Sequence, residues 1–202
     1  MKRAPFDVMV IVDPRIDGVL DGLSQLSDRA SGERIAIQLR AKDASEAELF
    51  ALARAVAAVQ PAMSRLIVND RATVARAIAA DGVHLPEIGG RVEAARRAMS
   101  SGALVGCSCH DAAGVAQRAS EGADYVMLGP LGEVPGKPPL SADAFRTIAS
   151  AARVPIVALG GIASREDADR AMALGASAIA VQRALVDPSG PAWIAAWLTS
   201  RA

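Results

Sequence analysis

Short runs of Val, Ile and Leu alternate along this chain with longer, alanine-rich stretches in which apolar residues recur at helical spacing. The short runs are mostly apolar, without a strict alternation of apolar and polar residues, which is typical of parallel strands buried on both faces. They predict eight strands, at residues 8–12, 35–39, 66–68, 82–85, 104–108, 125–128, 156–159 and 178–181. The intervening stretches predict eight helices, at residues 18–27, 46–59, 72–80, 92–100, 112–121, 142–152, 165–174 and 191–200.

Eight successive strand–helix units are the number that closes a barrel, so the pattern predicts an α/β fold, a single (βα)8 TIM barrel that spans residues 1–202 as one domain. The alternative is an open, doubly wound sheet. A dinucleotide-binding sheet of that kind would need G-x-G-x-x-G after the first strand, and Asp13-Pro14-Arg15-Ile16-Asp17-Gly18 does not supply it.

A faint repeat supports the count of units. The segments 79–83, 121–125 and 174–178 each contain a glycine between a helical stretch and a strand. Glycine is common just after the last turn of a helix, so each segment predicts a helix that ends in a glycine turn.

The overall charge narrows the classes of partner. The 202 residues are 51% hydrophobic and carry 22 basic and 22 acidic residues, with a pI near 6.7. This balance argues against nucleic acid and against an anionic membrane surface, and no apolar run approaches the length of a membrane span. We therefore expect a cytoplasmic protein whose partner is a small molecule.

Two cysteines, Cys107 and Cys109, lie two residues apart on one apolar run. They would point to the same side of a strand, and no second pair follows nearby to complete a zinc site. They are expected to be buried thiols that pack as small hydrophobic groups.

Lysine is scarce in this chain, so each internal lysine is a candidate for a specific role. Three lysines stand against 19 arginines, and the two internal ones, Lys42 and Lys137, follow apolar runs. Alternation along the second strand places Gln38, Arg40 and Lys42 on one side, toward the mouth of the barrel. Two cations, Arg40 and Lys42, only two residues apart on such a strand would repel each other, so a phosphate or pyrophosphate between them is favoured over a merely solvated strand end.

Other polar residues stand where predicted strands end. They are Asn69 and Asp70 after the third strand, His84 on the fourth, and Ser108 and His110 at the end of the fifth. A single histidine is often a structural residue, but the catalytic groups of barrels lie at the carboxyl ends of strands. Taken together, these residues are interpreted as members of one pocket.

The last strands predict a lid and a second anion site. Residues 129–140 form a long loop rich in glycine and proline that carries Lys137, and such loops often close over active sites. Gly160 and Gly161 follow the seventh strand, and Gln182 and Arg183 follow the eighth. Glycines next to a short helix form the phosphate site common at this position in barrels, so two phosphorylated molecules, or one long one, are expected.

With these residues placed, residues 8–185 resemble the thiamine phosphate synthase superfamily, which includes the thiazole tautomerases. The resemblance rests on several motifs in order: Ile37-Gln38-Leu39-Arg40-Ala41-Lys42, Leu66-Ile67-Val68-Asn69-Asp70-Arg71, Ala80-Asp81-Gly82-Val83-His84-Leu85, Gly106-Cys107-Ser108-Cys109-His110, Gly122-Ala123-Asp124-Tyr125 through Gly129-Pro130, and Leu159-Gly160-Gly161-Ile162.

The resemblance implies a transferase that joins hydroxymethylpyrimidine pyrophosphate to thiazole phosphate, with Mg²⁺ on the pyrophosphate that leaves. By position it places Gln38, Arg40, Lys42, Asn69, His84, Ser108 and Lys137 around the pyrimidine and pyrophosphate. It assigns Asp70 to the metal, and Gly160, Gly161, Gln182 and Arg183 to the thiazole phosphate. Lys137, Ser108 and His110 are the candidates for direct roles in catalysis.

Three departures from the synthase pattern bear on function. Gly89 stands where synthases usually carry a second metal-binding aspartate, and Glu87 is the nearest carboxylate, so weak magnesium binding is expected. Val134-Pro135-Gly136 replaces the threonines before the lid lysine, and Arg183 replaces a serine. A synthase is the preferred interpretation; a thiazole tautomerase, in which His110 moves a proton, or a non-catalytic phosphate-binding relative are the alternatives.

The oligomeric state stays open at this stage. Trp193 and Trp197 lie four residues apart on the last predicted helix, where they would serve equally well in the core or in the interface of a homodimer.

Overall fold

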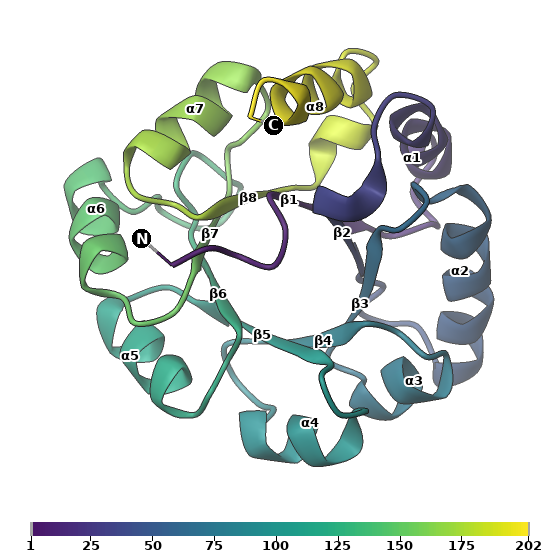
Figure 1. Cartoon of the computed structure of the whole chain (residues 1–202), viewed down its shortest axis with the longest axis horizontal. Helices are drawn as coiled ribbons and strands as arrows, with labels where there is room; N and C mark the ends of the chain where they lie inside the picture. The colour runs from purple at the N-terminus through teal and green to yellow at the C-terminus, as the bar shows by residue number, and fades with distance from the viewer. Residues whose placement is uncertain (1, 202) are drawn as a thin grey trace.

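The computed structural model of the chain describes residues 2–201 and contains one closed barrel of eight parallel strands (Figure 1). Each strand pairs with its neighbours in sequence order, and the eighth pairs with the first. The strands are β1 Val8–Val12, β2 Ile35–Leu39, β3 Arg65–Asn69, β4 Gly82–Leu85, β5 Leu104–Cys109, β6 Tyr125–Leu128, β7 Ile156–Leu159 and β8 Ala178–Val181. The predicted fold class is confirmed.

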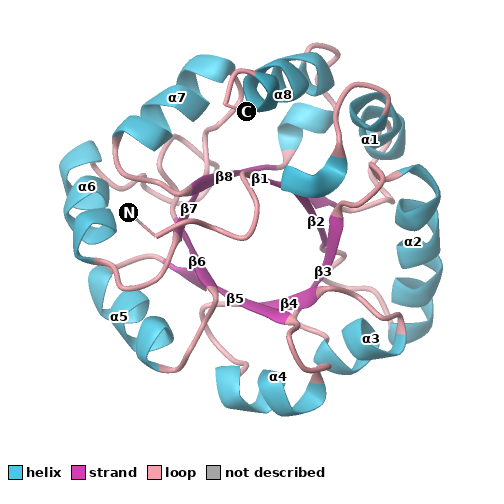
Figure 2. Ribbon diagram, in the orientation of Figure 1, coloured by secondary structure: helices cyan, strands magenta, loops and turns pink. Residues whose placement is uncertain are grey.

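Eight α-helices form a ring outside the strands (Figure 2). They are α1 Val19–Ser27, α2 Glu46–Val59, α3 Ala72–Ala77, α4 Val92–Ala98, α5 Ala112–Ser120, α6 Ala142–Ala151, α7 Arg165–Ala173 and α8 Gly190–Thr199. Two short 3-10 helices, η1 Gly32–Arg34 and η2 Arg183–Leu185, precede β2 and follow β8. None of the helices within residues 2–201 is long and apolar enough to cross a membrane.

Alternation along the strands separates two apolar regions. Outward side chains such as Ile37 and Leu39 join the core between the strands and the helices. Inward side chains such as Met9, Ile67 and Met127 fill the barrel itself. Because both faces of each strand are buried, the strands are predominantly apolar, which is the pattern from which they were predicted.

The amino-terminal end of the barrel is closed by the segment that precedes β1. This segment crosses the opening in Figure 1, and Phe6 enters the barrel interior, where it is 2% exposed. Its ring meets the ring of Tyr125 edge-on at a centroid distance of 5.1 Å, a favoured arrangement of aromatic pairs. Only the carboxyl ends of the strands therefore remain for a site inside the barrel.

The helix boundaries differ from the sequence prediction mainly at α3, which ends at Ala77 instead of residue 80. Ala79 has a φ of 53°, a left-handed conformation that ends the helix without glycine. Gly82, predicted as part of a helix-ending turn, lies inside β4, where an added Cβ would stand 2.5 Å from the Leu104 carbonyl oxygen. Gly122 and Gly175 do have positive φ, of 87° and 99°, so the repeat was correct at two of its three positions.

The cysteines and tryptophans have clear places in the core. Cys107 and Cys109 are both free thiols and both buried, as predicted. Burial raises the pKa of the Cys107 thiol to about 11 and that of Cys109 to about 12, so neither is a ready thiolate. Trp197 is fully buried, whereas Trp193 packs against the core with part of its surface exposed.

Candidate active site at the mouth of the barrel

A cavity of about 640 Å³ opens at the carboxyl ends of the strands. Its wall comes from the end of β2, the end of β5, the loop after β6, and the turns after β7 and β8. The predicted site residues among its lining are Arg40, His110, Lys137, Gly160, Gly161, Gln182 and Arg183. Residues that lie far apart in the sequence are thus brought to one hollow by the closure of the barrel.

The end of β2 supplies a cation and an amide. Arg40 is half-buried, and burial lowers the pKa of its guanidinium, an effect that the nearby Asp13 carboxylate opposes. Gln38 lies one layer deeper, 1% exposed, and its Nε2 has no hydrogen-bond partner within the described residues. A buried donor without a partner carries a desolvation cost, which a ligand that accepts a hydrogen bond would remove.

Lys42 and Asp70 lie outside this cavity. Both side chains are exposed, and neither belongs to its lining. Asp70 has a φ of 63° and forms an ion pair with the neighbouring Arg71 at 3.2 Å. Asn69 is half-buried and stands opposite His84 in the strand register.

His84 belongs to the polar layer beneath the cavity. It is 2% exposed, its Nδ1 is hydrogen-bonded to the Tyr125 hydroxyl at 3.2 Å, and its Nε2 to the Ser108 hydroxyl at 2.8 Å. Burial, helped by the positive charge of Arg40, lowers the pKa of His84 to about 3. The imidazole is therefore neutral at physiological pH, and it holds Ser108 in place from below.

Gly106 makes the layer around His84 possible. In the strand register it lies between His84 on β4 and Tyr125 on β6. An added Cβ at Gly106 would stand 2.0 Å from the Tyr125 ring. The absence of a side chain lets the His84 and Tyr125 rings stack at 5.7 Å across β5.

His110 stands higher, in the cavity wall. Its Nδ1 is hydrogen-bonded to the Gly129 carbonyl oxygen, so this nitrogen carries the proton and Nε2 is the acceptor. The Lys137 ammonium lies 2.8 Å from Nε2 and donates to it, and a Glu87 carboxylate oxygen lies 3.5 Å from the same nitrogen. The Lys137 ammonium, the His110 imidazole and the Glu87 carboxylate thus form one polar cluster.

A tight turn places Lys137 over the mouth. Val134 and Lys137 form an isolated antiparallel bridge, and Gly136 between them has a φ of 78°. Proline followed by glycine at positive φ is the usual sequence of a type II turn, and Pro135-Gly136 fits it. Val134, Pro135 and Gly136 therefore build the turn that carries Lys137.

The far wall of the cavity is backbone-rich. Gly160 and Gly161 have φ values of 96° and 71°, and the loop after β6 packs directly on them. An added Cβ would lie 2.5 Å from Pro130 at Gly160, and 2.5 Å from Gly132 at Gly161. Gln182 and Arg183 begin the short helix η2 beside these glycines in the same cavity wall.

No group of three or more His, Cys, Asp and Glu side chains that could hold a metal ion by itself occurs within residues 2–201. The two predicted ligands have other neighbours: Asp70 pairs with Arg71, and Glu87 faces His110. Mg²⁺ commonly takes only one or two carboxylates together with substrate phosphate oxygens, so either carboxylate could hold the ion only jointly with a phosphorylated ligand.

Sequence reasoning missed three residues around the site. Asp13, at the end of β1, lies close enough to Arg40 to affect its pKa, and its own pKa is lowered by its hydrogen bond to Arg15. Glu133 lines the cavity, and Tyr125 supports His84. Tyr125 is the chain's one tyrosine and sits at the inward position of its strand, which could have marked it.

The fold and the position of the cavity define a (βα)8 barrel that gathers its reactive groups at the carboxyl ends of its strands. The profile of one family, described as thiamine monophosphate synthase, matches residues 8–185 of this chain. The chain belongs to this family.

Relatives named thiamine-phosphate synthase match most of the chain. The Laribacter hongkongensis protein is 33% identical over 200 residues, which cover 95% of this chain and 92% of the relative. The Methanoculleus marisnigri protein is 36% identical over 186 residues, 90% of this chain and 88% of the relative. Among solved structures, thiamine phosphate pyrophosphorylase from Pyrococcus furiosus superimposes with a TM-score of 0.81 over 98% of this chain and 96% of its own, at 24% identity.

Proposed function

We propose that this protein is a thiamine phosphate synthase, a transferase that joins hydroxymethylpyrimidine pyrophosphate to thiazole phosphate and releases pyrophosphate. Its membership of the family and the names of its relatives support this assignment. The observation that carries the site is a cavity of about 640 Å³ whose lining includes three cationic side chains, Arg40, Lys137 and Arg183. Two phosphorylated substrates could meet in it.

The leaving group would bind between β2 and the lid. When the carbon–oxygen bond to pyrophosphate breaks, negative charge grows on the departing oxygens, and fixed cations stabilise that charge. Arg40 and Lys137 are the candidates within the cavity, and Lys42 is a candidate for its outer edge. His110 would position the Lys137 ammonium, because its Nε2 accepts a hydrogen bond from Nζ.

The pyrimidine would lie deeper, against polar groups that are neutral. The unpartnered amide of Gln38 and the Ser108 hydroxyl can hydrogen-bond to a heteroaromatic ring. His84 would act through Ser108 as a positioning residue, since its own ring nitrogens are both occupied. Asn69, which stands opposite His84, would complete this end.

The thiazole phosphate would bind at the wall formed by Gly160, Gly161, Gln182 and Arg183. Glycines leave the backbone open to a phosphate group, and Arg183 adds a guanidinium where the family usually has a serine. This end holds the acceptor, while the lid end holds the group that leaves.

The proposal includes a magnesium ion bound together with the leaving pyrophosphate. Asp70 and Glu87 are the carboxylates that would hold it, together with oxygens of the pyrophosphate. When bound, the ion would neutralise charge on the leaving group. Because two separate carboxylates form a poor site by themselves, we expect weak binding in the absence of pyrophosphate.

The decisive experiment is an assay of thiamine phosphate formation from both substrates over a range of magnesium concentrations. Wild-type turnover is expected, and its absence at every magnesium concentration would overturn the proposal. His110→Asn separates the proposal from the tautomerase alternative. It should keep much of the coupling activity, whereas a general acid or base at His110 would lose about 10²- to 10⁴-fold in proton exchange on a thiazole phosphate carboxylate.

The cytoplasm remains the predicted location, and a homodimer remains open. Trp193 packs at the edge of the core with its indole nitrogen buried and without a partner in the described chain. Light scattering during size-exclusion chromatography would determine whether a second copy covers this helix.

A further inference from the structure

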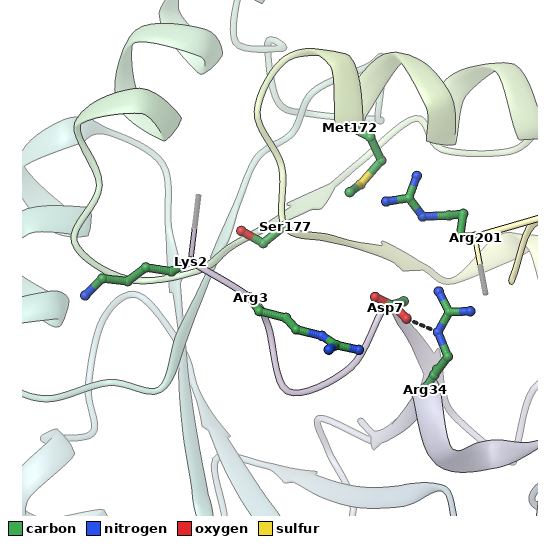
Figure 3. Close-up of a pocket in the computed structure, with 7 residues that line it drawn as sticks. All are labelled: Lys2, Arg3, Asp7, Arg34, Met172, Ser177 and Arg201. Carbon is green, nitrogen blue, oxygen red and sulfur yellow. Dashed lines mark hydrogen bonds and ion pairs between the residues drawn. The ribbon is translucent and has the colours of Figure 1, made fainter.

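A second hollow, of about 450 Å³, lies at the opposite end of the barrel from the mouth (Figure 3). It brings together the segment before β1, the start of β2, the region between α7 and β8, and the end of the described chain. The residues that line it are Lys2, Arg3, Asp7, Arg34, Met172, Ser177 and Arg201. Four of the seven are basic and one is acidic.

The centre of this hollow is built from fixed groups. The Asp7 amide donates to the Arg34 carbonyl at 2.8 Å, and the Asp7 carbonyl accepts from the Ile179 amide at 3.0 Å. The Arg34 guanidinium forms an ion pair with Asp7 through Nε and donates from Nη1 to the Leu198 carbonyl at 2.7 Å. Arg34 and Asp7 are therefore held by β8 and α8 as well as by each other.

Two further guanidinium groups have no ion-pair partner among residues 2–201. Arg3 extends toward Asp7 and Arg34 in Figure 3, and Arg201 points into the hollow from the other side. The Arg201 guanidinium lies 4.7 Å from the centre of the Trp197 ring, which orients it by a cation–π contact. The Lys2 ammonium points away from this group.

The local charge contrasts with that of the whole chain. The chain carries 22 basic and 22 acidic residues, but in this hollow three guanidinium groups face one carboxylate. Like charges held at one place destabilise each other unless an anion joins them. The guanidinium fork of Arg3 or Arg201 matches the oxygens of a phosphate group with two parallel hydrogen bonds, and Arg34, whose Nε and Nη1 are engaged by Asp7 and Leu198, adds its charge and its remaining N–H groups.

We propose that Arg3, Arg34 and Arg201 form a binding site for a small polyphosphate anion of the pyrophosphate class at the closed end of the barrel. This inference does not rest on the synthase activity, because no residue of the site lines the mouth cavity. The bound anion would connect Arg3, in the segment before β1, with Arg34 at the start of β2 and Arg201 after α8. Because it binds only the folded protein, it would also raise the melting temperature.

Calorimetric titration with inorganic pyrophosphate tests the proposal. The mouth would bind the same anion, so the titration uses an Arg40→Gln/Lys137→Met/Arg183→Gln background in a magnesium-free buffer. One binding site per chain is expected there. Because a charge-assisted contact to phosphate is lost, adding Arg3→Gln or Arg201→Gln should weaken binding about tenfold each.

Two control variants in that background each remove one positive charge from a side chain outside the proposed site. Lys2→Gln lies on the same rim but points away, and Arg54→Gln lies on the outer helix α2; both should leave the affinity within about twofold. Quenching or enhancement of tryptophan fluorescence on titration, lost in Arg201→Gln, would place the anion beside Trp197.

Parallel titrations with ATP and with sulfate identify the source and class of the anion. Binding of ATP as tight as that of pyrophosphate supports a nucleotide source, and tighter binding of pyrophosphate supports the free anion. Sulfate binding as tight as that of pyrophosphate would overturn the assignment to polyphosphate. Absence of binding in the background, or equal binding in Arg3→Gln, Arg201→Gln and Lys2→Gln, would overturn the site itself.

Discussion

The polar layer around His84 and the mouth around His110 contain the same side chain in opposite surroundings. The two histidines come from neighbouring strands, β4 and β5, and both point inward. His84 lies deeper, enclosed by Tyr125 and Ser108, and its pKa falls to about 3. His110 borders the cavity. Its Nε2 accepts a hydrogen bond from Lys137, which lies on the loop between β6 and α6.

The difference shows that depth in a barrel decides what a polar side chain can do. A fully buried imidazole is neutral and satisfied by neighbours, so it can only hold other groups in place. An imidazole one layer higher keeps one nitrogen for the Gly129 carbonyl oxygen and the other for the Lys137 ammonium, which comes from the loop after β6. The following predictions test this contrast.

The largest effect is expected at the mouth. Lys137→Met should lower kcat/KM for thiamine phosphate formation about 10²- to 10³-fold, because a cation is lost beside the leaving group in a closed site. The free energy of unfolding should be unchanged, since the side chain lies on a loop. Steady-state kinetics and urea denaturation provide the two readouts. Lys2→Met, at the opposite end of the barrel, is the matched control, and an equal loss there would show that the effect of Lys137→Met does not come from the mouth.

The next effect concerns the buried layer. Gly106→Ala should lower the free energy of unfolding by about 1–3 kcal/mol, because the new Cβ would displace the Tyr125 ring. Gly114→Ala, on the helix α5, has neighbours no closer than 3.3 Å and should leave stability unchanged or slightly higher. Urea denaturation compares them. A Gly106→Ala protein as stable as the wild type would show that the layer can rearrange freely.

The pH dependence of stability should report His84. Its pKa is about 3 in the folded state and about 6.5 in an unfolded chain, so below pH 6.5 the unfolded state binds a proton that the folded state refuses. The free energy of unfolding should therefore fall by about 1.5 kcal/mol between pH 6.5 and pH 5. Denaturation of His84→Asn should lack this fall and that of His110→Asn should keep it. Equal slopes in the two variants would refute the assignment to His84.

The smallest effect is expected for magnesium. Gly89 has a φ of 114°, so the aspartate usual in the family would strain the backbone there. The neighbouring Ile88 side chain is 88% exposed, so an aspartate can replace it without loss of core packing. Ile88→Asp should bind magnesium about threefold to tenfold more tightly than wild type in the presence of pyrophosphate, and Ile88→Asn should not. Calorimetry measures the affinity, and identical values in all three proteins would remove this loop from the metal site.

The sequence alone determined the fold class and much of the mouth. The regular exchange of buried strands and amphipathic helices leaves few arrangements other than a barrel, because eight parallel strands with both faces apolar need helices all around them. The same alternation pointed Arg40, Ser108 and His110 inward, since side chains along a strand change sides at every residue.

Only the tertiary structure decided how deep each inward residue lies and what it meets. Depth depends on the stagger of neighbouring strands, which placed His84 opposite Gly106 and beneath Ser108. The tertiary structure also decided that Lys42 lies outside the cavity: the Arg40 amide still donates to the Val12 carbonyl, but the chain turns at residues 42–43 and strand alternation no longer applies. The contact of Lys137 with His110, and the gathering of Arg3, Arg34 and Arg201 around one hollow, join residues that no local pattern relates. Such contacts follow from closure of the whole barrel, which no short stretch of sequence contains.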